Sequence, residues 1–232
     1  MTAVKKWMNH KKLKLNEEKT ECLIVGKKGD LQRLNVNNIN ILGKEFDVTK
    51  PIRNLGVTFD KSLTFRDHIN HITNMAGYHL HNLSFLKKYV DQSVILKLVH
   101  NFVISRLDYC NSLYYGLPSN LLLRLQRVQF RAVRLIKGLS LRDRITPALI
   151  ELHWLPIRAR IIFKICTLAF QAMKFEKPQY IRNLLRCFST QTSLTLRHEM
   201  DVFRLIFRLE LLRDQYLVFL ILFRRTSNRA AI

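Results

Sequence analysis

The amino-acid sequence predicts an α+β fold that is mostly helical, with a short antiparallel strand region at the N-terminus followed by a bundle of four or five helices. Up to residue 60, short apolar or alternating runs are separated by turns that contain glycine. From residue 61 onward, apolar residues recur at intervals of three and four, which is the period of a helix. Because 48% of the 232 residues are hydrophobic, the composition excludes a disordered chain.

Three segments before residue 60 have strand patterns. Residues 22–25 form an apolar run before Gly26 and predict a short buried strand, after which residues 26–29 predict a turn. Residues 39–42 and 45–48 alternate on either side of Gly43 and predict a hairpin. Residues 55–60 are a further strand candidate.

Four helices are expected after residue 61. The third opens at Pro118 with Ser119 as its N-cap, and the fourth opens at Pro156 and runs to about Met173. Residues 202–223 are apolar nearly all round and predict a buried or partner-covered helix, or a stretch that does not fold. The expected core stripes are Phe65, Ile69, Ile72, Ala76, Leu80, Leu83, Phe85 and Leu86; Val94, Leu98, Phe102 and Leu107; Leu121, Leu125, Val128, Ala132, Leu135 and Ile136; and Ile157, Ile161, Ile165, Leu168 and Ala172.

The chain is strongly basic along its whole length. It has 39 Lys and Arg against 17 Asp and Glu, a formal net charge of +22. The third expected helix carries Arg124, Arg127, Arg131 and Arg134 at intervals of three, four and three, which places them on one face, and no acidic residue lies between positions 119 and 141. Guanidinium groups fit phosphate oxygens, so this face predicts contacts with a nucleic-acid backbone; the alternative is an ordinary solvated helix face.

The residues present argue against a metal site, a secreted protein and a membrane protein. The four cysteines lie far apart, the start of the chain has no signal-peptide core, and no apolar run is long enough to span a bilayer. These features predict an intracellular protein of the nucleus or cytoplasm, with no membrane and no small-molecule partner. His68 and His71 have one nearby carboxylate, so packed or surface imidazoles are favoured over a metal site.

No catalytic site can be named. Two-metal nucleotidyl transfer needs paired carboxylates, and the sequence contains no Asp-Asp and no Asp-x-Asp. Ser105, Asp108 and Cys110 lack the spacing of a nucleophile elbow, and we interpret this segment as a packing corner with Tyr114 and Tyr115.

Several segments, taken together and in order, resemble the reverse transcriptase of jockey-like non-LTR retrotransposons. The segment at 13–21 is similar to the strand region that follows the catalytic Asp-Asp turn, and the segment at 55–60 to the hairpin that grips the primer end. Three later blocks are similar to blocks of the family farther along the chain. These blocks are Ser105–Pro118, Leu125–Gln129 and Leu152–Ile157 with Arg160 and Ile161.

The resemblance implies a C-terminal part of that enzyme, an RNA-directed DNA polymerase of the nucleotidyltransferase class. Residues 1–60 would be the end of the palm, 61–150 the helical thumb, 151–187 a post-thumb extension and 188–232 a divergent tail. The magnesium-binding aspartates would lie upstream of this chain. Gly56 and Phe59 would belong to the primer grip, and Lys19 matches a motif lysine near the incoming triphosphate.

The resulting hypothesis is a remnant of a transposable element that binds RNA, DNA or an RNA–DNA hybrid without chemistry of its own. No cofactor is expected in this chain. The alternative is a basic helical nucleic-acid-binding or adaptor protein with no polymerase role. A working polymerase that takes its aspartates from another chain is disfavoured, because the catalytic strands of a palm pair within one sheet.

Overall fold

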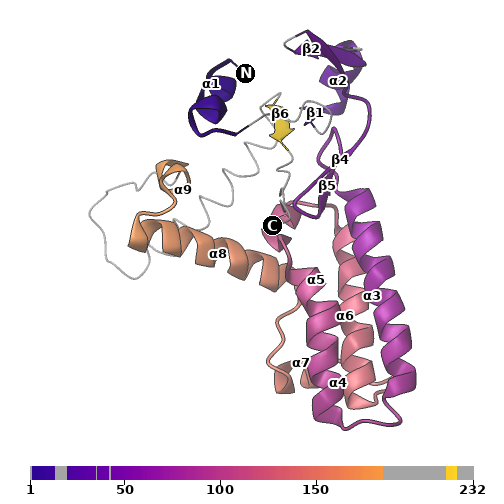
Figure 1. The fold of residues 1–232 in the computed structure, drawn as a ribbon. Coiled ribbons are helices and arrows are strands. Elements are labelled where there is room, and N and C mark those ends of the chain that lie inside the picture. The colour runs from indigo at the N-terminus through magenta and orange to yellow at the C-terminus, as the bar shows by residue number, and fades with distance from the viewer. Residues whose placement is uncertain (1, 14–19, 35, 42, 185–217, 224–232) are drawn as a thin grey trace, which may run out of the picture. The chain divides into compact units, whose positions relative to one another are not determined.

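The computed structural model describes residues 2–13, 20–34, 36–41, 43–184 and 218–223 (Figure 1). These belong to two compact units, one assigned to residues 1–67 with 214–232 and the other to residues 68–213. The chain is α+β and mostly helical, with short antiparallel strands ahead of the helices, as the sequence predicts. Lys19 and most of the predicted tail lie outside the described residues.

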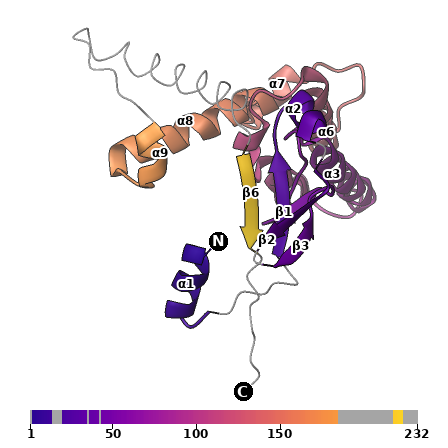
Figure 2. The ribbon, with the colours of Figure 1, turned by 90° about the horizontal axis from the view of Figure 1, so that it is seen from above.

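The described residues of the first unit form three antiparallel strand pairs and two short helices. Its elements are α1 (Thr2–His10), β1 (Thr20–Val25), α2 (Lys28–Leu34), β2 (Asn38–Ile41), β3 (Lys44–Asp47), β4 (Ile52–Asn54), β5 (Val57–Phe59) and β6 (Val218–Phe223). The strands β2 and β3 pair as the predicted hairpin, and β4 pairs with β5. Strand β1 pairs with β6, and Figure 2 shows these two strands side by side.

Two expectations for this unit are wrong. Residues 218–223 form a strand where the all-round apolar pattern predicted a helix, because the run supplies a second strand for the otherwise exposed edge of β1. The segment at 26–29 is only in part a turn, because helix α2 begins at Lys28.

Alternating residues of β1 belong to two separate cores. Cys22 and Ile24 cluster with Phe46 and Val48, whereas Leu23 and Val25 cluster with Ile52. Successive side chains of a strand point to opposite faces, so a continuous apolar run is the pattern of a strand covered on both sides.

The carboxylate of Asp60 organises the loop that follows β5. It accepts hydrogen bonds from the backbone N–H groups of Ser62 (3.1 Å), Thr64 (3.0 Å) and Phe65 (2.7 Å), and from the Thr64 hydroxyl (3.1 Å). Leu63 and Phe65 both have positive φ, at 49° and 53°. The left-handed conformation is costly for side chains of this kind, so the hydrogen bonds to Asp60 offset that cost.

The second unit contains the remaining helices. They are α3 (Arg66–Leu86), α4 (Gln92–Val99), a π-helical turn (His100–Ile104), α5 (Ser105–Asp108), a 3-10 turn (Asn111–Tyr114), α6 (Ser119–Lys137), α7 (Thr146–Glu151), α8 (Ile157–Phe175) and α9 (Gln179–Leu184). The predicted stripe of α3 is buried at Ile69, Ile72, Ala76, Leu80 and Leu83, and that of α8 at Ile157, Ile161, Ile165 and Ala172. The prediction is wrong at the end of α3, where Phe85 and Leu86 are exposed.

The prediction for the second helix is right at Leu107 and wrong by one residue before it. Ile95, Val99 and Val103 are buried, whereas Val94 and Phe102 are exposed and Leu98 is half-buried. The buried residues recur every four positions, and the wide π-helical turn keeps such a stripe on one face by unwinding the helix. A regular helical period could not anticipate that turn.

The ends of α6 are set by its flanking residues. Pro118 occupies the N-cap position, so the prediction of Ser119 as the cap is wrong. At the other end, Lys87 Nζ donates to the Leu135 carbonyl (2.7 Å) and Gln92 Nε2 donates to the Ile136 carbonyl (3.2 Å). These bonds satisfy carbonyls that the end of a helix leaves without intrahelical partners.

We expect Asp60→Ala to lower the free energy of unfolding by about 1–3 kcal/mol, because three backbone N–H groups lose their acceptor. Asp60→Asn retains one oxygen acceptor and should lose less. Urea unfolding of the two variants measures the difference, and equal stability of parent and Asp60→Ala would contradict this role.

Candidate nucleic-acid interface

Helix α6 has one buried face and one cationic face. Leu121, Leu125, Val128, Ala132 and Ile136 are buried, as predicted. On the other side Arg124, Arg127 and Arg131 are exposed and Arg134 is half-buried. The four arginines therefore lie on the solvent side of the helix, which is the placement a phosphate contact requires.

The guanidinium groups of this face contact neutral acceptors. Arg124 donates to the side-chain oxygen of Asn70. Arg134 donates from Nε to the Ser140 carbonyl (3.1 Å) and from Nη2 to the Leu141 carbonyl (3.4 Å).

Among the residues that the structure describes, no carboxylate pairs with any of the four arginines. The α6 cations thus keep their full charge toward solvent, and Arg127 and Arg131 are the least engaged of the set.

The primer-grip candidates lie at the β4–β5 hairpin. Gly56 has φ of +83° beside Leu55 at +46°, so the two form a tight turn in which both residues are left-handed and in which glycine is favoured. Phe59 is half-buried, packs on the cluster of Leu23, Val25 and Ile52, and meets the Phe65 ring edge-on at 5.7 Å. Phe59 is therefore a packing residue, and of the two candidates only Gly56 lies in the turn.

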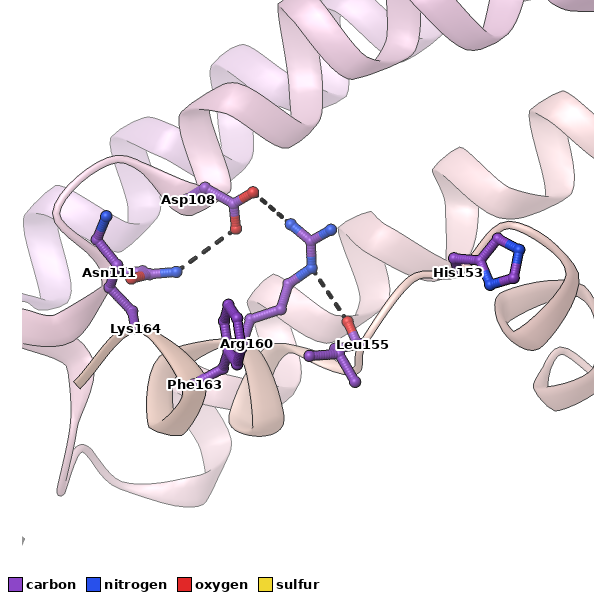
Figure 3. A pocket seen from close by; sticks show the side chains of 7 residues that line it. All are labelled: Asp108, Asn111, His153, Leu155, Arg160, Phe163 and Lys164. Atoms are coloured by element: carbon purple, nitrogen blue, oxygen red, sulfur yellow. Dashed lines mark hydrogen bonds and ion pairs between the residues drawn. The ribbon is translucent and has the colours of Figure 1, made fainter. Parts of the chain in front are cut away.

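The segment with Asp108 and Tyr114 is a packing corner. Tyr114 is fully buried, and its burial raises the pKa of its hydroxyl. Asp108 forms an ion pair with Arg160 of α8, and Arg160 Nε also donates to the Leu155 carbonyl at 3.1 Å (Figure 3). This joins two of the blocks on which the resemblance depends, although they are 52 positions apart.

A hollow of about 300 Å³ lies beside this ion pair. It is lined by charged and polar side chains together with the apolar side chains of Leu155 and Phe163, as Figure 3 shows. The lining residues are Asp108, Asn111, His153, Leu155, Arg160, Phe163 and Lys164.

Two glutamines of α6 bind the segment that opens α8. Gln129 is fully buried, donates from Nε2 to the Leu155 carbonyl (2.9 Å) and accepts from Gln126 Nε2 (2.7 Å). Gln126 Oε1 in turn accepts from the Ile157 N–H (2.9 Å). No contact was predicted for either glutamine, because a polar residue on a helix does not indicate which distant carbonyl it will bond.

The histidines lie as packed or exposed side chains. His68 is 2% exposed and its ring lies 6.1 Å from that of Tyr114, whereas His71 is exposed. The described part of the chain contains no group of three or more His, Cys, Asp or Glu residues placed to hold a metal ion. Within the same residues, no helix combines the length and the apolar character needed to span a bilayer.

Comparison of the chain with protein-family models, with curated proteins and with solved structures finds no match in any of the three.

The Asp108–Arg160 pair yields a prediction. The Arg160 side chain is 16% exposed, so its guanidinium is costly to leave without a carboxylate. We expect Asp108→Ala to lower the free energy of unfolding by about 1–2 kcal/mol, and the Asp108→Ala, Arg160→Ala double variant to show a coupling energy of about 1 kcal/mol.

The matched control is the Arg182–Glu176 pair, whose side chains are 48% and 63% exposed. Its coupling energy should stay under about 0.5 kcal/mol, because exposed pairs are screened by solvent. Additive effects at Asp108 and Arg160 would show that this corner does not depend on the ion pair.

Proposed function

We propose that this chain is the end of the palm, the thumb and the post-thumb extension of a reverse transcriptase from a jockey-like non-LTR retrotransposon, and that it binds the backbone of a template–primer duplex without chemistry of its own. The observation that carries the proposal is the cationic face of α6. Three of its arginines are exposed, and no described carboxylate neutralises any of the four. Binding to phosphates releases condensed counterions, which favours association.

The contacts between the blocks that resemble the reverse transcriptase family support the same proposal. The block at 125–129 bonds to the block at 152–157 through Gln126 and Gln129, and the block at 105–118 pairs with Arg160. Segments that are similar to one family in order along the chain thus also interact in space, as parts of a single structural unit would.

This chain does not supply the paired carboxylates that bind catalytic magnesium. The sequence contains no Asp-Asp and no Asp-x-Asp, and the described residues contain no metal-binding group. We therefore assign no reaction step to it. In this proposal Lys19 acts only in an enzyme that also supplies the aspartates.

A salt titration of RNA–DNA hybrid binding tests the proposal. If the four α6 arginines each contact a phosphate, the logarithm of the association constant should fall with the logarithm of salt concentration with a slope of about −3 to −4. Arg127→Glu with Arg131→Glu should reduce that slope by about two and weaken binding to every hybrid sequence alike. Fluorescence anisotropy at several salt concentrations gives both quantities.

The matched control reverses two exposed charges elsewhere in the same unit. Lys97→Glu with Arg158→Glu lowers the formal net charge from +22 to +18, as the α6 pair does, since each substitution removes two units. Its slope should stay near that of the parent. Hybrid binding that is indifferent to salt, or equal losses in the two variants, would refute a dedicated α6 interface.

Primer extension tests the absence of chemistry. We expect the purified chain to incorporate no dNTP on a primed RNA template with magnesium, because it lacks the paired carboxylates that the reaction needs. The same preparation must bind the hybrid, so that a lack of extension is not a lack of folding. Magnesium-dependent extension would overturn this part of the proposal.

A further inference from the structure

Helix α8 has a second apolar stripe on the side away from its core. Ile161, Ile165 and Ala172 are buried, whereas the rings of Phe163 and Phe170 are 64% and 48% exposed. At 100° per residue, Phe163 and Phe170 lie within about 20° of each other and roughly opposite the buried stripe. Their seven-residue separation places them about 10 Å apart along the helix.

Helix α8 is also cationic. The helix contains Arg158, Arg160, Lys164 and Lys174 and no acidic residue. Lys174 falls in the same sector as the two phenylalanines, and its Nζ lies 5.5 Å from the ring centre of Phe170 and 5.6 Å from that of Phe175.

The hollow described above opens beside the first of these rings. Phe163, Lys164 and Arg160 all line it, and its volume of about 300 Å³ has room for a flat heterocycle against the Phe163 ring (Figure 3). Arg160 is held by Asp108, which leaves Lys164 as the exposed cation at this point.

Exposed rings interleaved with uncompensated cations fit one class of partner better than others. An apolar protein surface would have to desolvate the lysines of this face without neutralising them. Single-stranded nucleic acid supplies unstacked bases for the rings and phosphates for the cations, whereas a duplex keeps its bases stacked inside.

We propose that the outward face of α8, formed by Phe163, Phe170 and Lys174, with Lys164 beside it in the hollow, binds single-stranded nucleic acid by base stacking. One base stacks on Phe163 within the hollow and another on Phe170, while the lysines contact the backbone. This surface is separate from the α6 arginines and goes beyond the proposed function, which concerns a duplex.

The test compares a single-stranded oligonucleotide with an RNA–DNA hybrid on the full chain. Phe163→Ala with Phe170→Ala should weaken binding of the single strand by about tenfold or more, since each substitution removes the ring on which a base stacks. The salt slope should stay unchanged, because no cation is removed. Binding of the hybrid should change by less than about twofold.

The matched control is Tyr78→Ala with Tyr89→Ala, which removes two rings that are 60% and 83% exposed and lie outside α8. It should leave single-strand affinity unchanged. Loss of affinity in both variants, or in neither, would overturn the proposal. A third outcome would also overturn it. If the α8 variant lost affinity for anionic phosphatidylserine vesicles but kept its affinity for the single strand, this face would bind lipid.

A gain-of-signal variant guards against a folding defect. Phe163→Trp should show fluorescence quenching when the single strand is added, beyond the change seen in the parent with its own Trp7 and Trp154. Absence of added quenching at saturating oligonucleotide would overturn the stacking role of Phe163. Because the α6 charge reversals are read with the hybrid and the α8 variants with the single strand, the two proposals fail independently.

Discussion

A chain of hydrogen bonds through two glutamines fixes the helical unit. Gln129 is fully buried between α6 and the segment that opens α8, and its amide is satisfied on both sides by the Leu155 carbonyl and by Gln126. A buried amide without partners costs about 1–3 kcal/mol, so the two helices can pack in only one register without that loss. The register turns the arginines of α6 and the phenylalanines of α8 toward solvent.

The distribution of the few acidic residues explains why the arginine face keeps its charge. Within the described part of the helical unit, Asp108 pairs with Arg160, Glu151 with Lys137 and Glu176 with Arg182, while Asp143 accepts from the Ser140 N–H. Each of these contacts holds a loop or a helix end. Like charges three and four residues apart on a helix repel one another, so such a face is stable only when solvent ions or an anionic partner screen it.

Local periodicity was enough to predict β1, the β2–β3 hairpin and the helices α3, α6 and α8. It did not predict β4, and it placed the turn residues Leu55 and Gly56 in the strand that is β5. It failed where the outcome depends on distant residues. The pairing of β6 with β1 joins residues about 200 positions apart. The Asp108–Arg160 pair joins two segments, and the local sequence of neither one indicates the other as its partner. The arginine face was predictable because all four residues lie on one helix. The aromatic face of α8 was not predicted, because a sequence does not distinguish exposed phenylalanines from phenylalanines of the core.

The segments that resemble reverse transcriptases contribute several residues to the interior. Tyr114, Gln129 and Trp154 lie inside those blocks and are buried, and Asp108 acts on another helix. These residues determine packing, so a likeness confined to them bears on the fold more directly than on binding. Three of the four α6 arginines, and the exposed Phe163 and Phe170 of α8, lie outside the blocks. The two proposed binding faces therefore consist mostly of surface residues that the resemblance does not reach, and binding measurements on those faces test them independently of it.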